Sequence, residues 1–186
     1  CFRYTEKYMK ISIIGARKNH TGLGEYIAKY FRKNGVQVVS VLGTNKKSAQ
    51  KAASNLKKHH INARPFTDFA KMVQETSPDA TVIASPFPTH YEYLKKSIDS
   101  GLSVLCEKPF IWDVAGDIVR KTEALITKAR RKKLTLAMNS QLPFTIASYE
   151  RLCGKITPEE THRFLINMNP SMTGEAISIW QCWDRV

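Results

Sequence analysis

The sequence predicts an α/β domain built on a doubly wound parallel sheet. Short apolar segments alternate with longer segments in which apolar residues recur every three to four positions, as strands and helices alternate in a parallel sheet. Gly, Pro, Asn or Asp stands at most of the junctions, where turns are expected. The pattern yields six expected strands, at residues 11–14, 36–42, 63–66, 80–84, 103–106 and 134–138.

The helices expected between these strands have recognisable ends. Asn45 can cap the second helix, since an Asn side chain accepts a hydrogen bond from a free backbone N–H of the first turn. Thr89 and Glu92 have the spacing of a capping box, which predicts a helix that ends before Gly101. The first helix is expected to bury one apolar face, made of Leu23, Ile27, Tyr30 and Phe31.

The regular rhythm of strands and helices stops near the end of the sixth strand. We therefore expect one domain over residues 9–139 and the start of a second, α+β domain over residues 140–186. A helix near 144–153 and a strand-like segment at 162–169 are too little for a complete second domain. The first residue is not Met, so a complete short protein and a piece of a longer one both stay open.

The 186-residue chain is strongly basic, with 29 Lys and Arg against 16 Asp and Glu and a net charge of +13. This charge attracts polyanions, phosphorylated ligands and acidic surfaces alike. Most lysines fall on expected helix faces, so we interpret them as solvated charge, with nucleic-acid contact as the alternative. No apolar run is long enough for a membrane helix and no secretory signal is present, which predicts a cytoplasmic protein. The four cysteines are scattered without a CxxC pair, so we expect free thiols and no metal site.

Ligands of a parallel sheet bind beyond the carboxyl ends of its strands, so we take these ends as the candidate sites. After the first strand, Gly15 permits a tight turn, and Thr21 and Gly22 lie where a helix N-terminus would offer N–H groups to a phosphate. Ala16 replaces the second glycine of the G-x-G-x-x-G pattern, and Arg17 adds a positive charge. We expect the phosphates of a dinucleotide here, and a glycine turn without a ligand is the alternative.

The second strand ends in Thr44, Asn45 and Lys46, where an NAD-binding fold commonly places an acid that accepts hydrogen bonds from the ribose hydroxyls. This segment contains no acid. A hydroxyl, an amide and an ammonium group suit a 2′-phosphate instead, because hydrogen bonds to charged groups are strong. We therefore expect NADP as the cofactor rather than NAD. A lysine that merely opens a solvated helix is the alternative.

The fourth strand ends in the segment "ASPFPTH", where Pro86 stiffens the loop after Ser85. His90 is expected at the first position of the next helix, where the helix dipole disfavours a charged imidazole. A neutral ring beside the crevice could stack on a ligand or form a hydrogen bond with it. A histidine that starts a helix without a further role is the alternative.

The fifth strand ends in the segment "CEKPF", which places an acid and a base at the sheet edge. Pro109 disfavours helical geometry at Lys108 and allows a cis peptide bond, so we expect Lys108 on extended backbone with Glu107 helping to orient it. An ammonium group there can donate a hydrogen bond to a substrate hydroxyl or transfer its proton. An exposed turn pair is the alternative.

Taken in order, the Gly15 turn, "ASPFPTH", "CEKPF" and the strand ending in Asn139 resemble the nucleotide-binding half of the Gfo/Idh/MocA family, the relatives of glucose-fructose oxidoreductase and inositol dehydrogenase. The resemblance covers about residues 10–141. It implies a Rossmann fold and an NAD(P)-dependent dehydrogenase. Such an enzyme transfers a hydride between the nicotinamide and a sugar, polyol or similar cyclic alcohol.

The resemblance also implies roles for single residues. Lys108 matches the family's catalytic lysine. The residues that match those shaping the cofactor site are Ser85, Pro86, His90, Glu107 and Pro109. Asn139 and Gln141 lie where the chain crosses towards the substrate domain.

The family's large second domain is almost wholly missing from this sequence, so its remaining catalytic residues have no counterpart here. Two interpretations therefore stay open. The full-length protein, in this family a candidate homo-oligomer, is an oxidoreductase acting on a small sugar or polyol. Alternatively, the protein is a non-catalytic NADP-binding sensor or partner-binding protein of the same fold.

Overall fold

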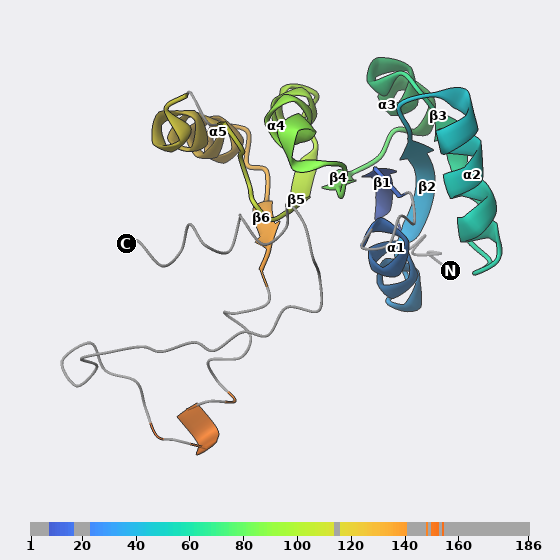
Figure 1. The fold of residues 1–186 in the computed structure, drawn as a ribbon, viewed down its shortest axis with the longest axis horizontal. Coiled ribbons are helices and arrows are strands. Elements are labelled where there is room, and N and C mark those ends of the chain that lie inside the picture. Colours follow the sequence, from blue (N-terminus) through green and yellow to red (C-terminus); the bar gives the residue numbers. More distant parts are fainter. Residues whose placement is uncertain are drawn as a thin grey trace, which may run out of the picture. The chain divides into compact units, whose positions relative to one another are not determined.

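The structure is a computed structural model that describes residues 8–16, 23–113, 116–140, 148, 150–152 and 154. Its centre is a six-stranded sheet with the strand order β3-β2-β1-β4-β5-β6 (Figure 1). Every neighbouring pair of strands is parallel. The strands are β1 (Lys10–Ile14), β2 (Gln37–Leu42), β3 (Arg64–Phe66), β4 (Ala80–Ile83), β5 (Ser103–Glu107) and β6 (Leu136–Asn139). The strand order reverses between β1 and β4, which is where such sheets open a ligand crevice.

Helices cover both faces of the sheet (Figure 1). They are α1 (Gly24–Lys33), α2 (Lys46–Lys57), α3 (Phe69–Thr76), the short 3₁₀-helix η1 (Phe87–Thr89), α4 (His90–Asp99) and α5 (Ile118–Arg131). One buried cluster joins Ala28 of α1 and Leu56 of α2 to the sheet. The other joins Met72 of α3, Leu94 of α4 and Leu125 of α5 to its opposite face. The predicted doubly wound sheet is therefore confirmed.

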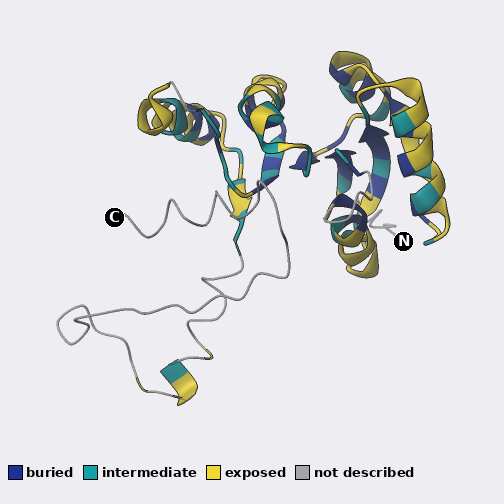
Figure 2. Cartoon of the chain, in the orientation of Figure 1, coloured by how far each residue is buried: buried dark blue, intermediate teal, exposed yellow. Residues whose placement is uncertain are grey.

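The predicted apolar face of α1 is only partly correct. Ile27 and Phe31 are half-buried against the core, whereas Leu23 and Tyr30 are 36% and 67% exposed. Ala28 is fully buried, and its small side chain lets this side of the helix rest closely on the sheet. The outward side of α1 is correspondingly exposed in Figure 2.

One of the two predicted helix caps is confirmed and the other is wrong. The side chain of Asn45 accepts a hydrogen bond from the backbone N–H of Ser48 at 2.9 Å, as expected for an N-cap. Thr89 does not cap α4, because it already has helical backbone geometry at the end of η1. Its hydroxyl instead donates to the carbonyl oxygen of Pro86 at 2.8 Å, so a proline-led 3₁₀ turn runs directly into α4.

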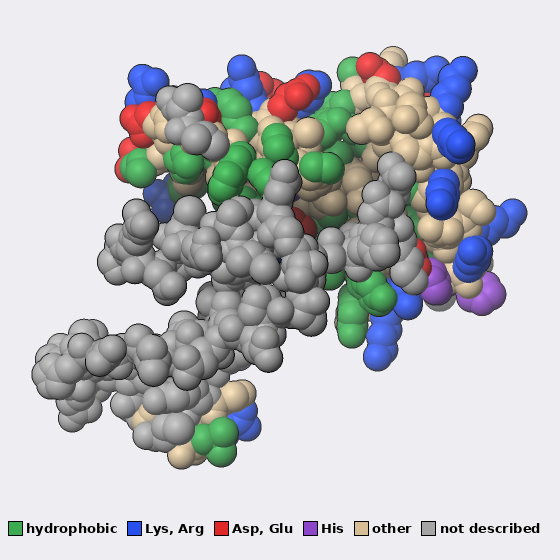
Figure 3. Space-filling view, viewed as in Figure 1, with side chains coloured by type: hydrophobic (Ala, Val, Ile, Leu, Met, Phe, Trp, Pro, Cys, Tyr) green, Lys and Arg blue, Asp and Glu red, His purple; other side chains and the backbone are tan. Residues whose placement is uncertain are grey.

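The basic side chains lie on helix surfaces, as predicted. Along α2, Lys46, Lys47, Lys51 and Lys57 are all exposed, and blue side chains line this part of Figure 3. None of the described helices is long and apolar enough to cross a membrane.

Cys106 of β5 is a buried free thiol. Burial, with a smaller contribution from the neighbouring Glu107 carboxylate, raises the pKa of this thiol to about 12. The other three cysteines lie outside the described residues. The second domain expected over residues 140–186 also lies almost entirely outside them and stays a prediction.

Candidate functional site

The turn after β1 packs directly against the segment after β4. Gly15 has a φ of +86°, and a Cβ atom at this position would lie 2.5 Å from backbone atoms of Ser85. Both the backbone conformation and the close approach therefore require glycine. The N–H of Gly15 donates to the carbonyl oxygen of Leu42 at 3.1 Å, so the turn also contacts the end of β2. The predicted glycine turn thus lies at the point where the strand order reverses.

Ala16 and Gly24 connect this turn to α1. Ala16 is buried, with only 1% of its surface exposed. A Cβ atom on Gly24 would lie 2.8 Å from the Cα of Ala16, so the first turn of α1 packs against the glycine turn. The other predicted residues of this loop, Arg17, Thr21 and Gly22, lie outside the described residues.

Thr44, Asn45 and Lys46 lie between the end of β2 and the start of α2. All three are exposed. The Asn45 oxygen accepts the N-cap hydrogen bond, so its amide N–H₂ group takes no part in the cap. The first turn of α2 contains no acidic residue. This helix start therefore presents a positive dipole end, a hydroxyl and an ammonium group, which together favour an anion.

His90 is buried, with only 1% of its surface exposed. Its Nδ1 lies 2.7 Å from the carbonyl oxygen of Pro109, and its Nε2 lies 2.8 Å from the carbonyl oxygen of Ser85. Both ring nitrogens contact the protein backbone in this structure, and a direct contact of the ring with a ligand stays a prediction. What the sequence did not indicate is that the ring joins the segments after β4 and β5.

The segment "CEKPF" holds one buried and one exposed charged side chain. Glu107 is buried, and its Oε1 accepts a hydrogen bond from Nδ2 of Asn139, its partner in the register of β5 and β6. Lys108 is exposed, and the Lys108–Pro109 peptide bond is cis. The structure thus pairs Glu107 with Asn139, a contact that sequence reasoning did not propose.

The described site residues therefore share one edge of the sheet. Contacts run from Gly15 to Ser85, from Ser85 through His90 to Pro109, and from Glu107 to Asn139. Because all six strands are parallel, the carboxyl ends of β1, β2, β4, β5 and β6 meet at this edge. Gln141 lies outside the described residues.

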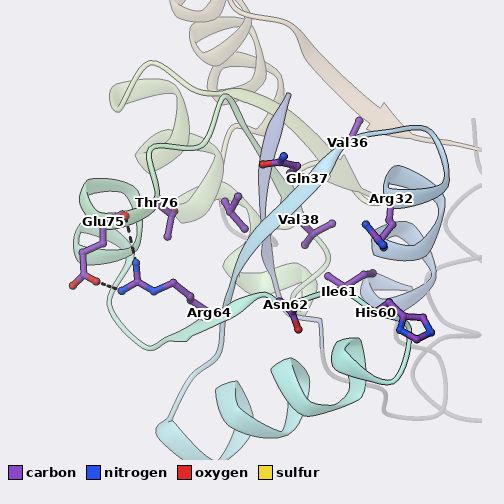
Figure 4. Close-up of a pocket in the computed structure, with 11 residues that line it drawn as sticks. Arg32, Val36, Gln37, Val38, His60, Ile61, Asn62, Arg64, Glu75 and Thr76 are labelled. Atoms are coloured by element: carbon purple, nitrogen blue, oxygen red, sulfur yellow. Dashed lines mark hydrogen bonds and ion pairs between the residues drawn. The ribbon is translucent and has the colours of Figure 1, made fainter. Parts of the chain in front are cut away.

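A groove of about 530 Å³ lies at the opposite edge of the sheet (Figure 4). Its lining includes Arg32 near the end of α1, Arg64 at the start of β3 and Glu75 near the end of α3, and Arg64 forms an ion pair with Glu75. Helices α1 and α3 end here, so these arginines offset the partial negative charge of helix carboxyl ends. None of the predicted site residues lines this groove.

Residues 9–140 match the family described as "Oxidoreductase family, NAD-binding Rossmann fold". The chain belongs to the Gfo/Idh/MocA family. The match includes each strand and helix of the sheet described above and all the described site residues. The resemblance predicted from the sequence motifs is therefore confirmed, as is the Rossmann fold.

Relatives of this Gfo/Idh/MocA chain include two inositol dehydrogenases. Inositol 2-dehydrogenase 4 from Saccharopolyspora erythraea is 28% identical over 127 residues, which are 68% of this chain and 36% of that protein. An NADP(+)-named scyllo-inositol 2-dehydrogenase from Bacillus subtilis is 33% identical over 90 residues, which are 48% of this chain and 26% of that protein.

A solved structure is similar as well. UDP-N-acetylglucosamine 3-dehydrogenase from Acidithiobacillus ferrooxidans is 27% identical, with a TM-score of 0.62 over 79% of this chain and 43% of that one. The chain thus spans less than half the length of the Gfo/Idh/MocA relatives it matches.

Proposed function

We propose that this chain is the NADP(H)-binding part of an oxidoreductase that transfers a hydride to or from an alcohol carbon of a sugar, polyol or similar cyclic alcohol. The observation that carries the proposal is the convergence of the Gly15 turn, the Ser85 segment and the Lys108–Pro109 segment at one edge of the sheet. The similarity to an inositol dehydrogenase and a UDP-N-acetylglucosamine dehydrogenase supports the substrate class.

The residues present fit a dinucleotide. The Gly15 turn lies at the point where the strand order reverses, and the start of α2 nearby is free of acidic side chains in its first turn. Backbone N–H groups at the start of α1 would hold the pyrophosphate, beside the close approach of the Gly15 turn to Ser85. When bound, the nicotinamide supplies the hydride acceptor or donor of the reaction.

Lys108 is the acid-base residue of this proposal. Oxidation of an alcohol releases a hydride from carbon and a proton from oxygen, and the proton needs an acceptor. The amine of Lys108 would accept that proton, and its ammonium form would return it to the carbonyl oxygen in the reverse direction. The exposed position of Lys108 at the end of β5 leaves it accessible to a substrate.

Thr44, Asn45 and Lys46 favour NADP over NAD in this proposal. Their exposed groups can donate hydrogen bonds to a 2′-phosphate, and no carboxylate in the first turn of α2 would repel it. The NADP(+)-named relative from Bacillus subtilis is consistent with this preference.

Titration with the two reduced cofactors tests the proposal. We expect the fluorescence of NADPH to increase on binding, with an affinity in the micromolar range and at least tenfold tighter than that of NADH (~1.4 kcal/mol). A chain that binds neither cofactor at millimolar concentration would exclude the function. A full-length protein that binds NADPH tightly but turns over no sugar or polyol would support a cofactor-sensing protein in place of an enzyme.

A further inference from the structure

We propose that His90 is a positioning residue that holds the Ser85 segment and the Lys108–Pro109 segment at a fixed separation. The inference rests on the proposed function, because these two segments form part of the proposed cofactor site. His90 is the first residue of α4 and is almost completely buried. Its two ring nitrogens lie 2.7 and 2.8 Å from the carbonyl oxygens of Pro109 and Ser85.

Because both partners are carbonyl oxygens, the ring is the donor in each hydrogen bond that it forms with these segments. A carbonyl oxygen only accepts hydrogen bonds, so the ring must provide the N–H group. A neutral imidazole donates from one nitrogen and a protonated one donates from both. The two nitrogens of an imidazole point in different directions from one rigid ring. His90 can therefore bridge two backbone segments that no strand pairing joins at this point.

The two bridged segments lead to different parts of the site. Ser85 is the residue whose backbone packs against Gly15, so its position determines the shape of the glycine turn. Pro109 follows Lys108, so its carbonyl position affects where the proposed acid-base residue stands. Through His90, the glycine turn and Lys108 are held in one connected unit.

The rest of α4 is fixed to the core and to the sheet by contacts that do not involve His90. Leu94 and Ile98 are fully buried in the core. Ser97, about two helical turns after His90, accepts a hydrogen bond at 2.8 Å from the hydroxyl of Thr81 in β4. The helix is therefore anchored to the sheet independently of His90, and the ring extends from a fixed element to two loops.

The test compares four variants of the full chain. His90→Phe keeps an aromatic ring of similar size and removes both ring nitrogens. His90→Asn retains an N–H₂ group near the place of Nδ1, towards Pro109, and His90→Gln retains one near the place of Nε2, towards Ser85. Ser97→Ala is the matched control, because it removes a buried hydrogen bond from the same helix without touching either segment.

Two readouts separate positioning from general stability. Hydrogen exchange at the non-proline residues of 85–89 and 108–111 reports on the two segments without any ligand. We expect His90→Phe to accelerate exchange at least tenfold in both segments, His90→Asn mainly in 85–89 and His90→Gln mainly in 108–111. NADPH titration should show at least tenfold weaker binding for His90→Phe and recovery of part of that loss in the Asn and Gln variants.

The Ser97→Ala control shows whether a general loss of stability could explain the effects of the His90 variants. Ser97→Ala should lower the melting temperature while leaving NADPH affinity and exchange at 108–111 within about twofold of wild type. The positioning role would be overturned if His90→Phe exchanged at wild-type rates in both segments. It would also be overturned if Ser97→Ala lost as much NADPH affinity as His90→Phe. If the wild-type chain binds no cofactor but exchange responds as expected, the proposed function fails and the role of His90 is supported.

Discussion

Asn139 at the end of β6 donates a hydrogen bond to the buried carboxylate of Glu107 at the end of β5. The two residues are partners in the parallel register, so the contact connects the outermost pair of strands at the site edge. A buried carboxylate that loses its partner bears the full cost of desolvation.

We therefore expect Asn139→Ala to lower the free energy of unfolding by about 1–3 kcal/mol. Ala137→Ser, at an exposed position on the same strand, should change it by less than about 0.5 kcal/mol. Urea denaturation of both variants measures the difference. Equal effects of the two substitutions would show that the Glu107 contact contributes nothing.

A comparison of Gly15 with Gly35 separates the cost of backbone strain from the cost of a steric clash when glycine is replaced. Both have positive φ angles, +86° and +78°, but a Cβ atom on Gly35 would meet nothing within 4 Å. Gly35→Ala should cost about 1–2 kcal/mol from the left-handed conformation alone. Gly15→Ala should cost at least about 1–3 kcal/mol more, because its Cβ must displace the Ser85 backbone.

Gly15→Ala should also weaken NADPH binding by at least tenfold, whereas Gly35→Ala should leave it unchanged. Thermal unfolding and fluorescence titration measure the two effects. If both variants bind NADPH alike, the Gly15 turn has no part in the cofactor site.

In the full-length protein, Lys108→Ala should greatly slow turnover while cofactor binding persists. The proton transfer that Lys108 would perform is worth roughly 10²–10⁴-fold in rate. We expect turnover of an inositol or glucoside to fall by that factor, with the Kd of NADPH within about threefold of wild type. Lys51→Ala, an exposed lysine on α2, is the charge-matched control. A Lys108→Ala variant as fast as wild type would remove Lys108 from the mechanism.

Thr44→Asp should shift the cofactor preference from NADPH towards NADH. A carboxylate at the end of β2 repels a 2′-phosphate and accepts hydrogen bonds from a ribose diol. The ratio of the two affinities should change by at least tenfold in favour of NADH. Thr44→Asn has the same size without the charge and should change the ratio much less. An unchanged ratio in Thr44→Asp would show that the 2′-position does not contact this segment.

The buried thiol of Cys106 predicts a pH dependence of stability. Its pKa rises from an ordinary 9.0 to about 12 in the folded chain, chiefly because of burial. The unfolded chain therefore loses this proton first as the pH increases, and the contribution to stability is complete below about pH 9 and is lost between about pH 9 and 12.

Comparison with Cys106→Ala isolates this effect from the other groups that titrate in alkali. Between pH 9 and 11 the wild-type free energy of unfolding should fall more steeply than that of the variant, by up to ~1.4 kcal/mol per pH unit. Chemical denaturation at several pH values measures both slopes. Parallel slopes would mean that the thiol is accessible to solvent in the folded chain.

The sequence predicted a structural feature correctly where neighbouring residues alone produce it. The Asn45 cap depends on residues three positions apart, and it forms as expected. Thr89 and Glu92 have an equally local pattern, but the two prolines before them start a 3₁₀ turn that makes the cap unnecessary. The buried face of α1 could not be predicted from apolar spacing alone, because the small Ala28 is fully buried while the larger Leu23 and Tyr30 are exposed.

By itself, the sequence determined the kind and order of the strands and helices, because hydrophobic periodicity and turn residues act over a few neighbouring positions. It also determined the need for glycine at position 15 and placed the charged pair at the end of β5. Only the tertiary structure decided the burial of His90 between two carbonyl oxygens and the pairing of Glu107 with Asn139. These contacts join residues distant along the chain, and they exist only because the strand order brings the ends of β4, β5 and β6 side by side.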